Sequence, residues 1–231
     1  MRCPLMIAGF LVAMLSAVNS GAGPIGLLDQ YAKDPPPSGI SSHGSVFGRY
    51  SYEPLGVHAI DVAQTFTVGI PGRLSYVEVF MNYVDLPTDP LVLDIRRTID
   101  GVPVENDTEA LGFLSVGPAA VPQGAHAFVG FDLTSLGIEV TSGEMLAFVL
   151  QSNTSFGNEY GTSGTAVIDQ YASGQYFHRV SWDTGQWKTA ASNVDLRFAT
   201  YVTPASVPDP GSTLLLLGMA LVGLRACRKR M

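Results

Sequence analysis

The sequence predicts an all-β protein built as a β-sandwich, and three observations lead to this fold class. Apolar and polar residues alternate with a period of two through the middle of the chain. Turn-forming residues separate these alternating runs at short intervals. No stretch of the middle shows the 3.6-residue period of a long amphipathic helix. Eight to ten short strands with frequent turns are typical of a sandwich.

The strands follow from the alternation, taken in chain order. The apolar members of the alternating runs are Val77, Val79, Met81 and Tyr83; Leu91, Leu93 and Ile95; Val129, Phe131 and Leu133; and Val194, Leu196 and Phe198. Residues 63–68 and 144–151 supply two further strands. The turn signals between them are Pro71-Gly72, Asp100-Gly101, Ser142-Gly143 and Asp183-Thr184-Gly185. Such pairs allow the tight turns that antiparallel neighbours need.

The N-terminus has the three parts of a secretory signal peptide. Arg2 precedes an apolar stretch over 5–18, and small residues follow, with cleavage expected after Ser20 or Ala22. We therefore assign residues 1–22 to the signal peptide. Residues 23–45 are rich in Pro, Gly and Ser without an apolar period and are expected to be a flexible leader. The β-sandwich domain is expected over 46–203, and a sorting and anchor segment over 204–231.

The C-terminal segment combines an extended motif, an apolar run and a cationic end. The motif is Val207, Pro208, Asp209 and Pro210; the membrane-stop residues are Leu214, Leu217, Leu221, Leu224, Arg225, Arg228, Lys229 and Arg230. A helix over 211–227 would rise about 25 Å, slightly less than a hydrocarbon core of about 30 Å. The cations stay in the cytoplasm by the positive-inside rule, which places the rest of the chain outside.

This tail resembles the PEP-CTERM sorting signal of exported bacterial proteins. That family carries a Val-Pro-Glu-Pro-like motif, a short hydrophobic helix and an Arg-rich end in the same order; Asp209 stands here at the position of its usual Glu. The resemblance implies an exosortase-like partner that cleaves near the motif. A C-terminal membrane anchor that is never processed is the alternative left open.

The middle of the chain resembles the jelly-roll domains of bacterial exported and surface-anchored proteins. The segments that carry this resemblance are residues 64–68, 100–103, 131–133, 142–144, 182–187 and 195–202. The expected fold is therefore a jelly-roll-like sandwich. Similar domains bind carbohydrate, but a shared shape does not assign a ligand.

Charge and cysteine content narrow the function classes. The chain has 13 basic and 20 acidic residues, of which the two ends hold five and one, so the middle carries a net charge near -11. An acidic surface of this size argues against nucleic acid and anionic lipid as partners. Cys3 and Cys227 both lie in the terminal signals, and the mature domain is therefore expected to have no disulfide.

Catalytic motifs are absent from the sequence. His43, His58, His126 and His178 are too dispersed for a metal motif, and Asp183-Thr184-Gly185 has no second copy for an aspartic-protease pair. No catalytic residue and no metal ligand are assigned. A secreted glycoside hydrolase, or another polysaccharide-active enzyme, remains the alternative because acidic pairs that form only in space are invisible in sequence.

Aromatic residues before the last strand give the binding hypothesis. Tyr171, Tyr176, Trp182 and Trp187 lie amid Gly, Ser and Asn, and such rings stack on sugars or fill a core. No cofactor is expected; Asp169, Gln170 and Asp195 offer the oxygen ligands of a structural calcium ion, without an EF-hand spacing. The expectation is a non-enzymatic exported protein, anchored in the inner membrane in transit and then placed at the cell surface or extracellular matrix, where it binds polysaccharide.

Overall fold

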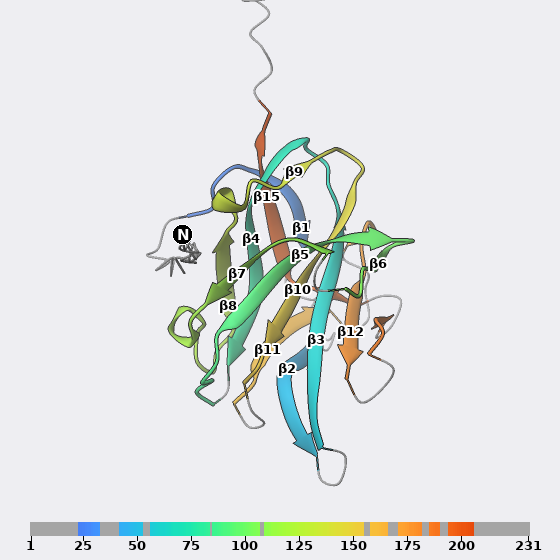
Figure 1. The fold of residues 1–231 in the computed structure, drawn as a ribbon. Helices are drawn as coiled ribbons and strands as arrows, with labels where there is room; N and C mark the ends of the chain where they lie inside the picture. The colour runs from blue at the N-terminus through green and yellow to red at the C-terminus, as the bar shows by residue number, and fades with distance from the viewer. Residues whose placement is uncertain are drawn as a thin grey trace, which may run out of the picture.

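The computed structural model describes residues 23–32, 42–52, 56–83, 85–106, 109–154, 158–165, 171–181, 185–189 and 194–205. The prediction of an all-β fold is confirmed, because these residues contain strands and two short 3-10 turns but no α-helix (Figure 1). No helix long and apolar enough to cross a membrane occurs within this part of the chain. The predicted signal peptide and the sorting tail lie outside the described residues.

The strands are all short to medium in length. Their bounds are β1 Leu27–Ala32, β2 Ser42–Tyr52, β3 Gly56–Thr67, β4 Gly72–Tyr83, β5 Leu91–Ile99, β6 Val102–Pro103, β7 Ala110–Val116, β8 Ala127–Asp132, β9 Glu139–Val140, β10 Met145–Ser152, β11 Tyr160–Thr165, β12 Tyr176–Val180, β13 Lys188–Thr189, β14 Asp195–Leu196 and β15 Phe198–Pro204. The 3-10 turns are η2 Pro118–Ala120 and η3 Thr134–Leu136.

Every strand pairing is antiparallel, and together the strands form one continuous sheet. Its main path runs β1-β15-β4-β11-β2-β3-β10-β5-β6, with β8 and β9 beside β4, β7 beside β5 and β12 beside β3. Strand β2 belongs to both halves: residues 42–47 pair with β11 and residues 48–52 pair with β3. Gly48, with a φ of 145°, lies at this change of partner, where the left-handed region favours glycine.

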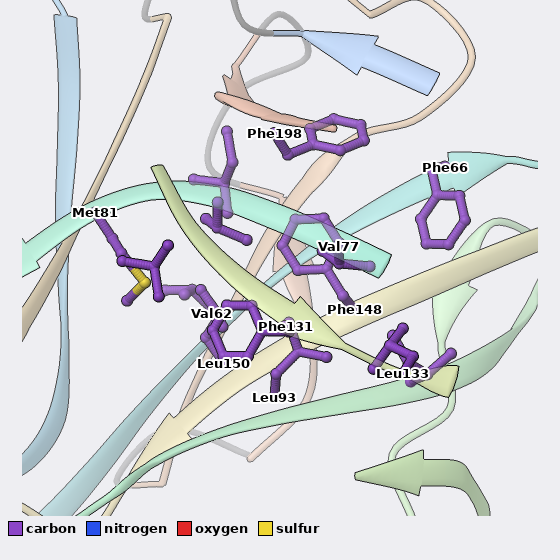
Figure 2. Close-up of a cluster of buried hydrophobic side chains, with 14 of the residues drawn as sticks. Val62, Phe66, Val77, Met81, Leu93, Phe131, Leu133, Phe148, Leu150 and Phe198 are labelled. Atoms are coloured by element: carbon purple, nitrogen blue, oxygen red, sulfur yellow. The ribbon is translucent and has the colours of Figure 1, made fainter. Parts of the chain in front are cut away.

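The sheet folds over at β2, so that two layers enclose the core. We call them the β4 layer (β1, β15, β4, β8, β9, β11) and the β10 layer (β12, β3, β10, β5, β7). Apolar side chains from both layers form one cluster, which Figure 2 shows in close-up. Phe148 of β10 meets Phe198 of β15 edge to face, with ring centroids 5.4 Å apart. Burial of these rings removes apolar surface from water and holds the two layers together.

The alternation in the sequence corresponds to this geometry. In β4 the side chains of Val77, Val79 and Met81 are completely buried, whereas Glu78 and Phe80 between them are only partly buried. Successive side chains of a strand point to opposite faces of its sheet, so Glu78 and Phe80 lie on the outer face of the β4 layer. The outer faces are where a binding site can form.

The expected leader over 23–45 contains strands in the structure. Strand β1 lies within it and pairs with β15, from Leu27 opposite Val202 to Ala32 opposite Phe198, and β2 begins at Ser42. The Asp29 carboxylate also accepts hydrogen bonds from the N–H groups of Gly69 (2.9 Å) and Ile70 (2.6 Å). The short β1 sequence has no clear alternation of its own. It becomes a strand because it pairs with β15.

Candidate functional site

The outer face of the β4 layer gathers aromatic rings from four strands. In the register of the sheet Phe128 lies opposite Phe80, and the Phe80 N–H donates to the Arg197 carbonyl on the other side. Tyr201 lies opposite Tyr76. Directly paired residues of antiparallel strands project to the same face, so these side chains form neighbouring rows.

Phe80 is the centre of the first row. Its ring lies 5.0 Å from Phe128 and 5.5 Å from His126, which it stacks against with an interplanar angle of 22°. The Arg197 guanidinium lies over the same ring, 3.9 Å from its centroid. A cation so close to an aromatic face is attracted by the electron density of the ring. This row therefore combines apolar ring surface with a fixed guanidinium.

The charge state of His126 follows from the same row. Partial burial, and then the positive charge of Arg197, lower the pKa of His126 below its ordinary value. At neutral pH its imidazole is therefore uncharged, and it adds ring surface rather than a second cation to the row.

Two tyrosines and a carboxylate form the second part of the face. Tyr76 and Tyr201 meet edge to face at 5.9 Å, and the Tyr201 hydroxyl donates to Glu78 at 2.9 Å. Burial, followed by the hydrogen bond and the charge of Glu78, raises the pKa of Tyr201 to about 12. Tyr31 lies opposite Ala199 in β15 and keeps 44% of its surface exposed.

Gly130 makes room for one of these rings. A Cβ at this position would overlap the hydroxyl and ring carbons of Tyr76. The absence of a side chain at Gly130 thus lets the Tyr76 ring lie down across β8. We call the whole set the aromatic face, and its members are Tyr31, Tyr76, Glu78, Phe80, His126, Phe128, Arg197 and Tyr201.

The aromatic residues singled out from the sequence as a possible binding site are not part of the aromatic face. Tyr171, Tyr176 and Trp187 are buried, with 7%, 2% and 7% of their surface exposed, and Trp182 lies outside the described residues. The Tyr171 hydroxyl accepts from the Thr67 N–H and donates to Gln30, both at 2.9 Å. Tyr171 and Tyr176 belong to the main core cluster, whereas Trp187 packs in a second, smaller cluster with Ala63, Val149 and Phe177.

Sequence reasoning missed the aromatic face because its members are spread from β1 to β15. A usable signal was present in β4, where Tyr76, Glu78 and Phe80 alternate with the core residues Val77 and Val79, although only 5% of the Tyr76 surface is itself exposed. Large rings at outward positions of a strand are unusual for a purely solvated face. Only the sheet register shows that β8 and β15 bring further rings beside them.

Of the three residues considered as calcium ligands, only Asp195 lies within the described residues. Asp195 is buried, and its carboxylate accepts from the Gln64 amide at 2.9 Å and from the Tyr171 N–H at 3.1 Å. The Leu196 N–H in turn donates to Gln64 at 2.8 Å. Asp169 and Gln170 lie outside the described residues. Across the described ranges, no group of three or more His, Cys, Asp and Glu side chains is arranged to hold a metal ion.

A second polar cluster lies on the outer face of the β10 layer. Arg96 is completely buried and donates to Asp94, while Arg179 donates to Asp61 at 2.8 Å. With its amide oxygen turned toward them, Gln151 accepts from Arg96 at 2.9 Å and from Arg179 at 3.3 Å. The carboxylates here face guanidinium groups rather than one another, which is the arrangement of a structural ion-pair array.

Comparison with known proteins bears on the tail rather than on the folded domain. The motif and the membrane-stop residues, 207–210 and 214–230, lie outside the described residues. Residues 206–231 match a known family of C-terminal sorting motifs, of the PEP-CTERM-like, exosortase-type kind. The chain therefore carries a sorting signal typical of exported, surface-associated proteins.

The particular signal is described as the VPDSG-CTERM motif. Its name spells Asp at its third position, so Asp209 agrees with this variant, and Gly211 agrees with its fifth letter. Pro210 stands where the motif has Ser.

No curated protein matches the sequence. Among solved structures, one similar chain is the cysteine protease and lectin-like domains of Cwp84, a surface layer associated protein of Clostridium difficile. The TM-score is 0.41 and the sequence identity 10%; the match covers 64% of this chain and 33% of that one. The chain thus spans about a third of the length of that protein.

Proposed function

We propose that this protein is a non-enzymatic component of the cell surface or extracellular matrix, sorted by its C-terminal tail and binding polysaccharide through the aromatic face. The match of residues 206–231 to a sorting motif carries the sorting part of the proposal, and the aromatic face supports the binding part. The folded sheet is a jelly-roll-like sandwich that presents the face to the outside. The apolar run and the cations hold the tail in the inner membrane, an exosortase-like enzyme cuts near the motif, and the released domain moves to the surface.

The sorting step is tested by mass analysis of the protein from its host. Replacing Pro208, Asp209 and Pro210 together with Ala should leave the chain uncut and retained in the membrane, because the apolar run and the cations still stop transfer. The matched control is Asp209→Glu, which keeps a carboxylate at the third position of the motif and should still be cut. A wild-type protein that keeps Met231 and stays in the membrane would refute sorting by cleavage and favour a passive anchor.

The aromatic face has the chemistry that sugar rings require. Tyr31 and His126 offer exposed ring surface for stacking on the apolar side of a pyranose, Phe80 positions Arg197 and His126, and Glu78 and Arg197 offer an acceptor and a donor for its hydroxyls. The net charge near -11 of the middle segment repels anionic polymers at long range. The best-suited ligand is therefore a neutral polysaccharide.

Affinity electrophoresis in gels containing a soluble neutral β-glucan tests this binding. Phe80→Ala and Tyr31→Ala should each weaken binding about tenfold, which corresponds to about 1.4 kcal/mol. Phe113→Ala is the control, because Phe113 is 65% exposed but belongs to β7 in the other layer. Tyr31 is an exposed residue, so its variant also reports on binding if the Phe80 variant is less stable.

Three outcomes would contradict the proposal. Unchanged retardation of both face variants would remove the aromatic face as the site. Stronger retardation in alginate, an anionic polymer, than in the glucan would contradict the class of ligand. Release of reducing ends from the glucan by the purified protein would contradict a non-enzymatic role and favour a glycoside hydrolase.

A further inference from the structure

Three large apolar side chains are exposed within four residues at, and just before, the start of β1, an edge strand of the sheet. Ile25, Leu27 and Leu28 keep 40%, 56% and 49% of their surface in contact with water. We call these three residues the apolar rim. Leu27 and Leu28 pair with Val202 and Tyr201 and so project to opposite faces of the sheet, which leaves apolar side chains exposed on both sides of this edge. Single exposed apolar residues are ordinary, but an apolar edge of this kind is suited to enter another apolar phase end-on.

The apolar rim lies at the end of the domain from which the tail departs. Leu27 is opposite Val202, and β15 ends two residues later at Pro204 (Figure 1). Pro204 is in turn opposite Gly72 at the start of β4, and the Ala205 N–H donates to the Pro71 carbonyl at 3.4 Å. The sorting motif match begins at residue 206, directly after this point.

The length of the tail limits how far this end can lie from the membrane. Nine residues, 205–213, separate Pro204 from the first leucine of the apolar run. A fully extended chain of that length spans about 30 Å. While the apolar run is in the bilayer, the end of the domain that bears the rim is therefore confined to the zone next to the lipid surface.

We propose that the apolar rim rests in the outer interface of the lipid bilayer while the tail is still attached, and that this contact holds the sorting motif at the membrane surface for the processing enzyme. The inference rests on the proposed sorting function and adds a second, surface contact to it. Arg73 and Glu139, which lie at the same end, pair with each other at 3.2 Å. The apolar side chains, rather than a cationic patch, thus provide the attraction to lipid.

The test uses the mature, uncut chain with Cys227→Ser, reconstituted into phosphatidylcholine vesicles. A single cysteine carrying an environment-sensitive fluorophore replaces Leu28 or, as the matched control, Leu86. Leu86 is 65% exposed and follows the far end of β4; Leu28 is level with Tyr76 through Tyr201, so the seven steps from Tyr76 to Tyr83 separate the two positions by about 23 Å. Lipids brominated near the interface should quench the label at position 28 at least threefold more than the label at position 86.

Flotation of the vesicles measures membrane association of the tail independently of the lipid contact of the apolar rim. Protein that does not float overturns both the membrane association of the tail and the rim contact. Protein that floats with the vesicles but shows equal quenching at both positions overturns only the proposed contact of the apolar rim with lipid. A label at position 28 that responds to protein density but not to brominated lipid would show a contact between two copies, and this outcome also overturns the lipid contact.

A second variant connects the rim to processing in the host. Leu27→Glu together with Leu28→Glu should slow removal of the tail severalfold, because two carboxylates at the rim disfavour the interface. Leu86→Glu adds a charge at the opposite end and should leave the cleavage rate unchanged. Equal cleavage of all three proteins would overturn the positioning role.

Discussion

Replacing Arg96 with Met should cost about 3–5 kcal/mol of unfolding free energy, because the substitution leaves a buried carboxylate without its counter-charge. The Arg96 side chain is completely buried and donates to Asp94 at 2.8 and 2.6 Å. It also donates to the carbonyls of Val104 at 3.1 Å and Glu105 at 3.3 Å, which ties the segment after β6 to the β10 layer.

Urea denaturation followed by tryptophan fluorescence measures this loss. With a slope of about 2 kcal/mol per molar urea, the midpoint should fall by about 1.5–2.5 M. The combined change Arg96→Met and Asp94→Leu should recover most of it, since a buried ion pair and an apolar pair of similar volume are close in stability.

An exposed ion pair in the same protein is the control. Arg73 and Glu139 lie 3.2 Å apart with 51% and 67% of their side-chain surfaces exposed. Arg73→Met should therefore change the free energy of unfolding by no more than about 1 kcal/mol. If Arg96→Met costs as little as Arg73→Met, the reasoning from burial is wrong.

Three further predictions address the fold and the aromatic face. Residues 46–203 alone should be at least about 3 kcal/mol less stable to urea than residues 23–205, because the shorter chain loses β1 with its charge-assisted hydrogen bonds and the part of β2 over 42–45 that pairs with β11; equal stability would make both segments dispensable. The lowered pKa of His126 means that the unfolded chain takes up the proton first, so stability should fall as pH drops below about 6.5. The urea midpoint of His126→Gln should vary less between pH 7.5 and pH 5, and an unchanged variation would exclude this histidine. Gly130→Ala should displace the Tyr76 ring, cost about 1–3 kcal/mol and weaken glucan binding; a variant with wild-type stability and retardation would contradict the contact.

Local pattern and turn chemistry were sufficient to predict much of the β-structure. Val77, Val79 and Met81 alternate with outward residues, and all three are buried in β4 as their period required. The tail was also predictable, since a linear sorting motif is recognised as sequence and needs no partner from elsewhere in the chain.

The sequence was misleading where a segment depends on a distant partner. Residues 27–32 have a weak pattern of their own and become β1 through pairing with β15, more than 160 positions further along the chain. The density of rings near residues 171–187 was compatible with both a binding site and a core, and in the structure Tyr171, Tyr176 and Trp187 are buried. Composition does not show which side of a ring faces solvent.

The sequence by itself thus determined the all-β class, the main alternating strands and the sorting signal at the C-terminus, because each depends on neighbours within a few residues. The tertiary structure alone decided which outward rings share a face, which guanidinium lies over Phe80, and that the apolar rim is next to the end of β15. These are relations between strands far apart in the chain. They are set by sheet register, and register is a long-range property that period-two alternation leaves undetermined.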